Sequence, residues 1–260
     1  MMNIQWFPGH MAKTRRLLTE NLKLVDVVAE LLDARIPASS KNPEIDSIVN
    51  MKPRIILLNK SDLADAAVSA EWAKWYKDMG TPVIFVDSVK GTGLIQLKQG
   101  LKTLMRDRLE RDRQKGRLFR PIKAMIVGIP NVGKSTFINK IAGKAATVTG
   151  DRPGVTKGKQ WIRLNPEIEM LDTPGILWPR FDDRETALHL AFTGAIKDEV
   201  LVMEEIALKF VKKMAELNKT DAILGKYHIE QGEKPLDILD NIARKKGFII
   251  NKTEIDYLRV

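Results

Sequence analysis

Eight residues near the middle of the chain have the types and spacing of a phosphate-binding loop. Residues 128–135, Gly-Ile-Pro-Asn-Val-Gly-Lys-Ser, follow the apolar run 122–127 and fit the pattern G-x-x-x-x-G-K-[ST]. Glycines let the backbone fold around phosphate oxygens, and the helix that begins near Lys134 adds the positive end of its dipole. The octet alone would also fit a glycine turn before an ordinary helix, but its chemistry indicates a polyphosphate ligand.

The last two residues of this loop have side chains that can bind phosphate and a metal ion. We expect Lys134 to reach the β- and γ-phosphates as a point charge and the Ser135 hydroxyl to ligate Mg²⁺, so that phosphoryl transfer has both positioning and charge neutralisation. Other residues of this stretch that we assign to the nucleotide are Asn131, Val132, Gly133 and Thr136.

A second polar stretch, Asn59-Lys60-Ser61-Asp62, follows the apolar run 54–58 and resembles the guanine-reading motif of GTPases. An ionised carboxylate only accepts hydrogen bonds, so Asp62 can take two from guanine N1–H and the N2 amino group, whereas adenine has no matching donor pair. Asn59 and Lys60 are expected to brace the loop. Alone, the tetrapeptide also fits a simple polar turn; together with the phosphate loop it indicates a guanine nucleotide.

The apolar run 82–86 leads to a third polar stretch, Asp87-Ser88-Val89-Lys90-Gly91. It resembles the short loop, usually Ser-Ala-Lys, whose backbone contacts guanine in GTPases, with Val89 in place of the alanine. Because the carboxyl ends of parallel strands meet at one edge of a sheet, we expect Asp87, Ser88 and Val89 to lie beside the guanine motif.

Two further stretches match the parts of a GTPase that respond to the γ-phosphate. Residues 150–157, Gly-Asp-Arg-Pro-Gly-Val-Thr-Lys, resemble a switch segment, in which Thr156 is the candidate that caps Mg²⁺ when a γ-phosphate is present. An expected pair of strands leads to Asp172-Thr173-Pro174-Gly175, a D-x-x-G pattern. In this pattern the Asp172 carboxylate orients Mg²⁺ through a water molecule and the Gly175 N–H senses the γ-phosphate.

Composition limits the class of protein. The 260 residues are 44% hydrophobic and 29% charged, which is typical of a globular chain long enough for one α/β domain and a smaller second one. The net charge of +10 favours polyanionic partners, and RNA, DNA and acidic membranes all fit. Because the chain has no cysteine, disulfides, thiolate metal sites and a cysteine nucleophile are excluded, and any metal is expected to have oxygen ligands.

The distribution of apolar residues predicts where the protein acts. No apolar stretch approaches the roughly 18 residues that span a bilayer, and residues 1–11 contain Pro, Gly and His where a secretion signal would have an apolar run. We therefore expect a cytoplasmic protein that makes no membrane contact.

Periodic apolar residues predict the elements that position the motifs. An aromatic turn at 4–10 precedes a helix from about 11 to 24; we expect buried strands at 25–32, 54–58 and 82–86, and helices at 42–51, 71–79, 94–113 and 135–142. The aromatic residues assigned to the core of the helix 71–79 are Trp72, Trp75 and Tyr76. A helical tail is expected from about Trp178, with a core of Leu188, Leu190, Phe192, Leu208 and Phe210.

Basic residues are concentrated in one segment of the chain. Residues 102–123 include nine basic and three acidic residues, and 111–121 is the candidate linker. A solvated helical face is the first interpretation of this run, and contact with RNA is the second.

The order of the motifs is unusual. In ordinary GTPases the phosphate loop comes first and the guanine motifs last, whereas here 59–62 and 87–90 precede 128–135 and 172–175, so the chain is circularly permuted. Because the motifs meet at one sheet edge, such rewiring preserves the site. With Phe-Pro-Gly-His at 7–10, Asp-Ala-Arg-Ile-Pro at 33–37 and Pro-Asn-Val-Gly-Lys-Ser in the phosphate loop, the whole chain resembles the YlqF family, the ribosome biogenesis GTPases A.

This resemblance implies a fold and a function. The fold would be an α/β circularly permuted P-loop GTPase domain with a mostly parallel sheet, residues 1–177, and a small all-α, RNA-binding C-terminal domain, residues 178–260. The protein would be a monomer that binds GTP and GDP and hydrolyses GTP in maturation of the large ribosomal subunit, with stimulation by ribosomes. Asn131 matches a pattern associated with potassium-stimulated GTPases, so K⁺ is an implied second cofactor beside Mg²⁺.

The water-orienting group is a separate question. Many GTPases have glutamine directly after D-x-x-G, but here the residue is Ile176, which cannot orient water. The resemblance points to an N-terminal histidine, here His10, and topology agrees, because a helix that returns to a parallel strand starts at the carboxyl edge where nucleotide binds. A capping turn without chemistry is the alternative for His10. His189 and His228 lack a motif and are expected to be structural.

Three functions compete at this stage. The first is a GTP-hydrolysing assembly factor, the second a nucleotide-gated RNA- or ribosome-binding module with incidental turnover, and the third a P-loop ATPase. Asp62 argues against the third. The first two differ only in turnover when ribosomes are present.

Overall fold

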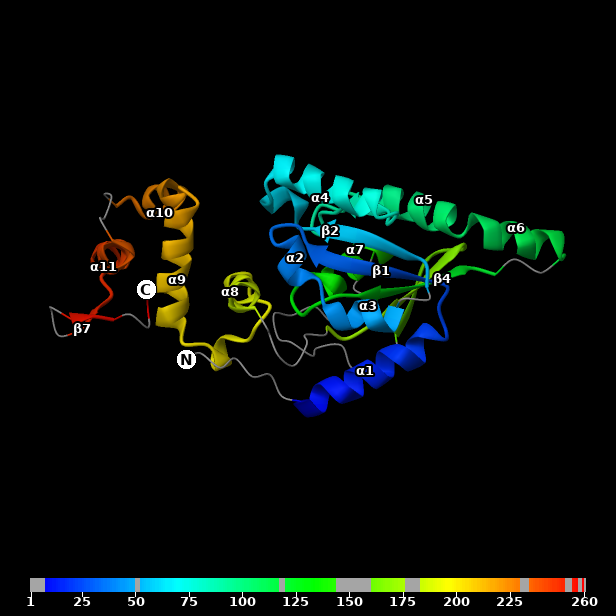
Figure 1. The fold of residues 1–260 in the computed structure, drawn as a ribbon, viewed down its shortest axis with the longest axis horizontal. Helices are drawn as coiled ribbons and strands as arrows, with labels where there is room; N and C mark the ends of the chain where they lie inside the picture. Colours follow the sequence, from blue (N-terminus) through cyan, green and yellow to red (C-terminus); the bar gives the residue numbers. More distant parts are fainter. Residues whose placement is uncertain are drawn as a thin grey trace. The chain divides into compact units, whose positions relative to one another are not determined.

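The computed structural model describes residues 8–49, 52–116, 120–143, 160–175, 183–229, 234–250, 254–256 and 259, and for residues 8–14 and 160 it describes only the backbone. The chain divides into two compact units, 1–186 and 187–260 (Figure 1). The domain boundary expected after Leu177, and residues 117–119 of the expected linker, lie outside the described residues.

A six-stranded sheet in the order β3-β2-β1-β4-β6-β5 forms the centre of the first unit. Five strands are parallel, and β5 pairs antiparallel with β6. The strands are β1 (Val27–Asp33), β2 (Arg54–Asn59), β3 (Val83–Phe85), β4 (Ile122–Val127), β5 (Gln160–Asn165) and β6 (Ile168–Asp172). The expected mostly parallel sheet is confirmed, and the pairing of β1 with β4 brings the guanine half of the chain beside the phosphate half.

The helices of this unit are α1 (Pro8–Leu22), α2 (Pro37–Ser40), α3 (Pro43–Val49), α4 (Ala66–Asp78), α5 (Leu94–Leu104), α6 (Arg106–Gln114) and α7 (Lys134–Ala142), with a 3₁₀ turn at Ser61–Leu63. Pro37 begins α2, as proline can at the first position of a helix. One expectation for these helices was wrong. The single helix expected at 94–113 is two helices that meet at Met105.

The other predicted bounds also shift. Helix α1 already begins at Pro8, so His10 belongs to its first turn and not to a turn ahead of it. Helix α4 begins at Ala66, earlier than expected, because the Asp65 side chain accepts hydrogen bonds from the Ala67 and Val68 N–H groups and caps it.

The aromatic residues of α4 differ in burial. Tyr76 is buried as predicted, but Trp75 is 47% exposed, so the assignment of Trp75 to the core was wrong.

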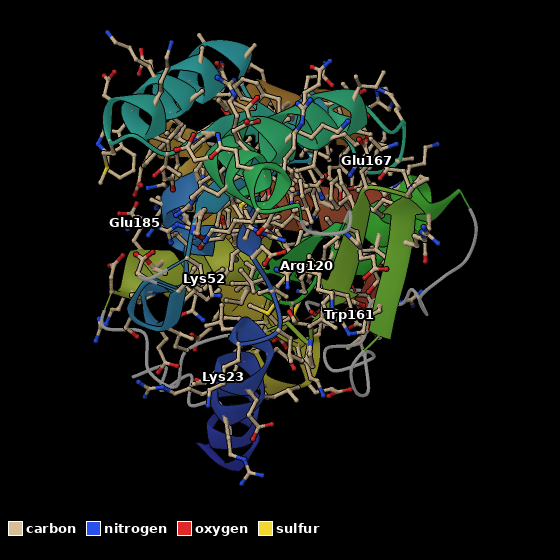
Figure 2. The ribbon with its side chains drawn as sticks, turned by 90° about the vertical axis from the view of Figure 1, so that its right-hand side faces the viewer. Lys23, Lys52, Arg120, Trp161, Glu167 and Glu185 are labelled. Atoms are coloured by element: carbon tan, nitrogen blue, oxygen red, sulfur yellow. The ribbon has the colours of Figure 1, made fainter. Side chains whose placement is uncertain are left out.

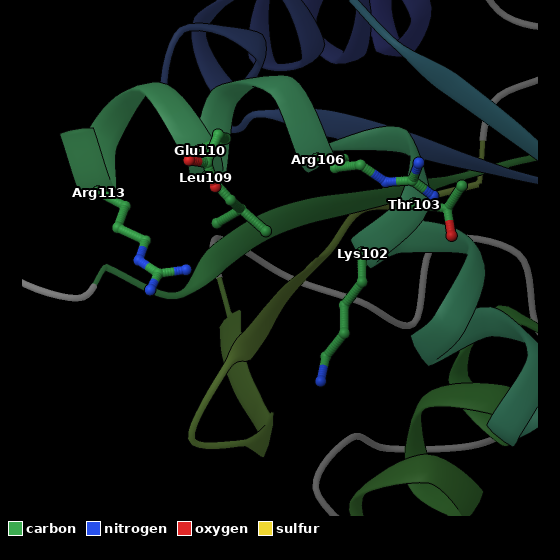
Figure 3. Close-up of a pocket in the computed structure, with 6 residues that line it drawn as sticks. All are labelled: Lys102, Thr103, Arg106, Leu109, Glu110 and Arg113. Carbon is green, nitrogen blue, oxygen red and sulfur yellow. The ribbon is translucent and has the colours of Figure 1, made fainter.

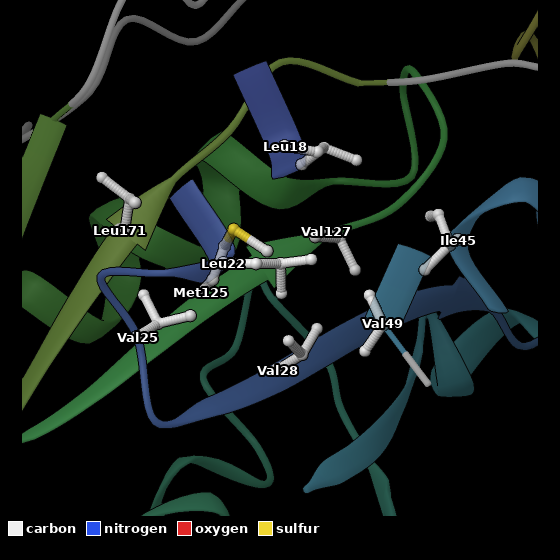
Figure 4. Packing of buried hydrophobic residues seen from close by; sticks show 9 residues of the cluster. All are labelled: Leu18, Leu22, Val25, Val28, Ile45, Val49, Met125, Val127 and Leu171. Atoms are coloured by element: carbon white, nitrogen blue, oxygen red, sulfur yellow. The ribbon is translucent and has the colours of Figure 1, made fainter. Parts of the chain in front are cut away.

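One face of the sheet is covered by α1 and α3. Leu18 and Leu22, one turn apart on α1, and Ile45 and Val49 on α3 pack on Val28 and its neighbours (Figure 4). The full cluster is Leu18, Leu22, Val25, Val28, Ile45, Val49, Met125, Val127 and Leu171. Because α1 leads back to the start of β1, its first turn lies toward the carboxyl edge of the sheet (Figure 1).

The second unit is mostly helical. Its elements are α8 (Arg184–Phe192), which contains the division between the units, a 3₁₀ turn at Asp198–Val200, α9 (Met203–Glu216), α10 (Thr220–Tyr227), α11 (Pro235–Lys246), and the short pair β7 (Ile249–Ile250) and β8 (Glu254–Ile255), which the all-α expectation did not include. Its core is Val211, Ile223, Ile238, Leu239 and Ile242.

The predicted tail core was therefore partly wrong. Leu190 is fully buried, but Leu208 and Phe210 are 38% and 40% exposed. Phe192 and Phe210 instead meet edge to face, with ring centroids 5.3 Å apart. His189 lies within α8, and His228 ends α10 in a left-handed conformation. None of the helices in the described parts of the chain is long and apolar enough to cross a membrane.

Candidate nucleotide-binding site

The phosphate loop leaves β4 at its carboxyl end and is packed tightly against the other half of the chain. A Cβ at Gly128 would lie 2.5 Å from the Leu31 carbonyl oxygen, and one at Gly133 would lie 2.5 Å from Asn59 Nδ2. Gly133 also has a φ of 99°, which disfavours any other residue. Both glycines of the motif are therefore required by the close approach of the phosphate loop to Leu31 of β1 and Asn59 of β2.

Lys134 begins α7 and is buried in the loop that it follows. Its ammonium donates to the Gly128 carbonyl at 3.0 Å and to the Ile129 carbonyl at 2.6 Å. Burial lowers the pKa of Lys134 to about 8, although the nearby charge of Asp172 acts in the opposite direction. An ammonium has three N–H donors, so one remains for a phosphate oxygen.

Asn59 joins the guanine motifs to the phosphate loop. Its Nδ2 donates to the Val132 carbonyl at 2.7 Å, while its Oδ1 accepts from the Ser88 hydroxyl at 2.6 Å and from the Ser88 N–H at 3.1 Å. Asn59 is 1% exposed, so these bonds are shielded from water. One amide thus fixes three segments of the site that are far apart in the sequence.

Lys60 makes a second link between the two halves. It has a left-handed backbone with φ 57°, and its ammonium donates to the Asn131 carbonyl at 3.0 Å. The same ammonium lies 3.2 Å from the Asp33 carboxylate at the end of β1. Asp33, which was not among the predicted site residues, therefore helps to place Lys60.

Asp33 is buried and held from a second side by Arg35. The guanidinium donates to Oδ1 at 2.8 Å and to Oδ2 at 2.7 Å. Burial alone would raise the pKa of Asp33, but the hydrogen bonds from Arg35 and the charges of Lys60 and Arg35 hold this pKa below its usual value. A signal for Asp33 was present in the sequence: a carboxylate directly after a buried strand, at the edge where the motifs meet.

The Asp62 side chain is partly accessible to solvent. Its side chain is 34% exposed, and its nearest cation is the Lys90 ammonium at 4.0 Å. The preceding Ser61 is anchored by a hydrogen bond from its hydroxyl to the Val86 carbonyl at 3.0 Å. The loop is thus fixed while the carboxylate stays accessible to a base.

Asp87 shapes the loop that follows β3. Its Oδ1 accepts from the Val89 and Lys90 N–H groups, each at 2.9 Å, and these bonds, that from Lys90 first, lower the pKa of Asp87. Asp87 is therefore a structural part of the loop. The Val89 N–H, in the loop whose backbone is expected to contact guanine, is engaged with Asp87 in this structure.

The D-x-x-G segment at the end of β6 reaches the phosphate loop. Asp172 and Thr173 are fully buried, and the Thr173 hydroxyl donates to the Ile126 carbonyl of β4 at 2.6 Å. A Cβ at Gly175 would lie 2.7 Å from Pro130 N and 2.9 Å from Lys134 Nζ. Gly175 is therefore in contact with the loop and with the side chain that are expected to hold the phosphates.

The donor set fits a magnesium ion that shares its ligands with a nucleotide. Ser135 lies in the first turn of α7, and Asp172 lies close enough to Lys134 for their charges to interact. Both supply oxygen, which Mg²⁺ prefers, and phosphate oxygens and water would complete the shell. Within the described ranges no three His, Cys, Asp or Glu side chains form a metal cluster.

Three predicted residues cannot be placed fully. Thr156 and Ile176 lie outside the described residues, and only the backbone of His10 is described. The others converge at the carboxyl edge of the sheet: Asn59, Lys60, Ser61, Asp62, Asp87, Ser88 and Val89 from the first half of the chain, and Asn131, Val132, Gly133, Lys134, Ser135, Thr136, Asp172 and Gly175 from the second.

Fold and site together define a circularly permuted GTPase. A family model described as 50S ribosome-binding GTPase matches residues 123–242, so it begins within β4 and leaves the strands β1 to β3 outside. Ribosome biogenesis GTPase A of Bacillus licheniformis is 47% identical over 257 residues, which covers 98% of this chain and 90% of that protein. The protein of the same name from Priestia megaterium is also 47% identical, with 98% and 89% covered.

Solved structures agree with this match. GNP-bound YlqF from T. maritima is 28% identical, with a TM-score of 0.61 over 95% of this chain and 89% of that one. A GDP-bound YlqF structure gives 28% identity and a TM-score of 0.62 over 94% and 89%. The chain belongs to the ribosome biogenesis GTPase A family.

Proposed function

We propose that this protein binds and hydrolyses GTP and acts as an assembly factor for the large ribosomal subunit. One observation carries the nucleotide part: the Asn59 amide bonds both to the phosphate loop at Val132 and to the loop at Ser88, so the motifs for base and phosphate form one site. The named relatives support the ribosomal part, because they are ribosome biogenesis GTPases.

Base selection rests on Asp62 in this proposal. Its accessible carboxylate accepts two hydrogen bonds from guanine, and adenine would leave it unpaired. Lys60, held between Asp33 and Asn131, keeps the guanine loop against the phosphate loop. Ser88, bonded to Asn59, fixes the second loop beside the base.

Hydrolysis rests on the second half of the site. Lys134 places its third N–H on the phosphates, and Gly175 presents its backbone N–H to the γ-phosphate. Ser135, Thr156 and, through water, Asp172 are the residues that would hold Mg²⁺, which when bound neutralises charge on the phosphate oxygens. Asn131 is the residue proposed to hold K⁺, and His10, in the turn of α1 nearest the carboxyl edge, is proposed to orient the attacking water.

The second candidate is a nucleotide-gated RNA-binding module whose turnover is incidental. The helical unit follows Gly175 closely in the sequence, which favours this second candidate. A change at the γ-phosphate sensor would be passed along only a short stretch of chain to that unit. We propose that the protein works as a cytoplasmic monomer in either case.

Sedimentation with purified large ribosomal subunits tests the function. The protein should sediment with the subunits more strongly with a non-hydrolysable GTP analogue than with GDP, and the subunits should accelerate GTP turnover. Binding without acceleration would favour the gated module. No binding in either nucleotide state would contradict the ribosomal role.

A further inference from the structure

Helix α6 lies far from the nucleotide. The segment that contains α5 and α6 connects β3 to the parallel strand β4, so it starts at the carboxyl edge of the sheet and ends at the opposite, amino edge. Figure 1 shows α6 at the end of the sheet where β4 begins. A ligand of α6 would therefore not compete with a nucleotide.

The sequence of α6 is not that of a helix that stabilises a core. Its residues are Arg-Asp-Arg-Leu-Glu-Arg-Asp-Arg-Gln, and none of them is buried, whereas α5 buries Leu97 and Leu101. A helix that buries none of its side chains needs another cause for its position. Ion pairs provide that cause here.

Some basic side chains of this region form ion pairs that stabilise the fold. Arg108 pairs with Asp26, which precedes β1, and with Asp112 at 3.5 Å. Arg120, just before β4, reaches the same Asp26 at 2.7 Å, and the Lys123 N–H donates to it at 2.9 Å. Asp26 therefore holds α6 against the sheet. The positive charges of Arg108 and Arg120 are already paired with its carboxylate.

A second group of cations lies on another side of these helices. Lys102, Arg106 and Arg113 line an open hollow of about 390 Å³ together with Thr103, Leu109 and Glu110 (Figure 3). Lys102 pairs with Glu167 at 2.5 Å, but no described carboxylate lies within ion-pair distance of Arg106 or Arg113. These two arginines are seven residues apart, which spaces them by about 10 Å along one face of a helix.

We propose that this hollow, the α6 surface, binds the phosphate backbone of RNA through Arg106 and Arg113; the inference builds on the proposed ribosomal function. Guanidinium groups match phosphate oxygens in geometry and charge. Among the described residues that line the hollow, Leu109 is the only apolar one, whereas the centre of a protein–protein interface is rich in apolar and aromatic residues. The chemistry of the surface thus favours a nucleic-acid backbone over an acidic protein.

Other charged side chains lie on the same end of the first unit. Figure 2 looks onto the end that carries α6, and it shows Lys23 and Lys52 there, together with Glu167, the partner of Lys102. Lys23 is exposed at the end of α1, and the Lys123 ammonium lies 5.1 Å from the ring centre of the half-exposed Trp161.

Charge reversal at the two arginines tests this assignment. Arg106→Glu with Arg113→Glu is compared with a matched control, Lys74→Glu with Lys77→Glu, which reverses two exposed charges on α4. The probes are an RNA duplex and purified large subunits, each titrated at several salt concentrations with GDP and with a GTP analogue. Melting curves and basal GTP turnover verify folding, and Arg106→Lys with Arg113→Lys should retain most of the affinity.

We expect the double variant Arg106→Glu, Arg113→Glu to bind RNA about tenfold or more weakly, equally in both nucleotide states. The slope of log affinity against log salt should fall by about 1 to 2. The control variant should change RNA affinity less than twofold. Unchanged duplex affinity would overturn the proposal, and loss of subunit binding alone would assign the surface to a ribosomal protein and also overturn it. If the duplex result is as expected but the unmodified protein binds no subunits, the α6 surface stands and the proposed function fails.

Discussion

The Lys60 ammonium lies 3.0 Å from the Asn131 carbonyl oxygen and 3.2 Å from the Asp33 carboxylate, so it connects the phosphate loop to the end of β1. Asp33 in turn accepts hydrogen bonds from Nε and Nη2 of Arg35. This chain of contacts explains how a permuted sequence keeps its loops in register: each half of the chain supplies one end of a short, partly buried hydrogen bond.

Asp33→Asn should loosen the guanine loop. The substitution leaves Lys60 and Arg35 without their counter-charge, so the affinity for GDP should fall by about tenfold and the free energy of unfolding by about 1 to 3 kcal/mol. Calorimetric titration and denaturant unfolding measure the two effects. Asp78→Asn, at an exposed end of α4, is the control. Native GDP affinity in the Asp33 variant would show that Lys60 needs no such support.

The low pKa of Lys134 predicts a pH effect on the nucleotide-free protein. Its pKa is about 8 in the folded protein and 10.5 for an ordinary lysine side chain, so between these values the unfolded chain binds a proton that the folded chain has released. The free energy of unfolding should therefore gain up to about 3 kcal/mol from this residue as pH rises from 8 to 10.5. The difference in stability between the native protein and Lys134→Met, measured across this range, isolates the effect. A difference that does not change with pH would contradict the shifted pKa.

His10→Ala should slow turnover and spare binding. Ile176 offers no polar group to orient water, and a positioned orienting group typically contributes about 10² to 10⁴-fold. We expect kcat for GTP in the presence of large subunits to fall by that order, while nucleotide Kd stays within a few-fold. His228→Ala, at the end of α10, serves as control. An unchanged subunit-stimulated kcat would remove His10 from the mechanism.

The motifs and the sheet were predictable because they obey local rules. A phosphate loop after a buried strand, and polar motifs that follow strand ends, have fixed positions in a parallel sheet, so the places of Asp62, Lys134 and Asp172 could be predicted from the motifs that these residues match. The permuted order required no new geometry. The strands β1, β2 and β4 consist mainly of apolar residues, which predicts burial on both faces of the sheet.

The remaining features depend on contacts between distant segments. The role of Asp33 follows from its bond to Lys60 across the sheet, and that of Asp26 from two arginines far along the chain. Helical periodicity continues through Met105, yet the buried face ends there, so pattern alone predicted one helix instead of α5 and α6. Leu208 and Phe210 fit the helical period but lie outside the stripe that packs on α11.

Exchange of Asp62 for Asn tests the central claim, a guanine site assembled from a permuted chain, most directly. The amide can donate to the xanthine oxygen where the carboxylate accepted from the guanine amino group, so Asp62→Asn should lose at least about tenfold in GTP affinity and gain affinity for xanthosine triphosphate. Competitive binding of the two nucleotides to the native protein and to the variant measures this exchange. Inverted preference in the variant is the predicted result, and an unchanged preference for GTP would contradict the site.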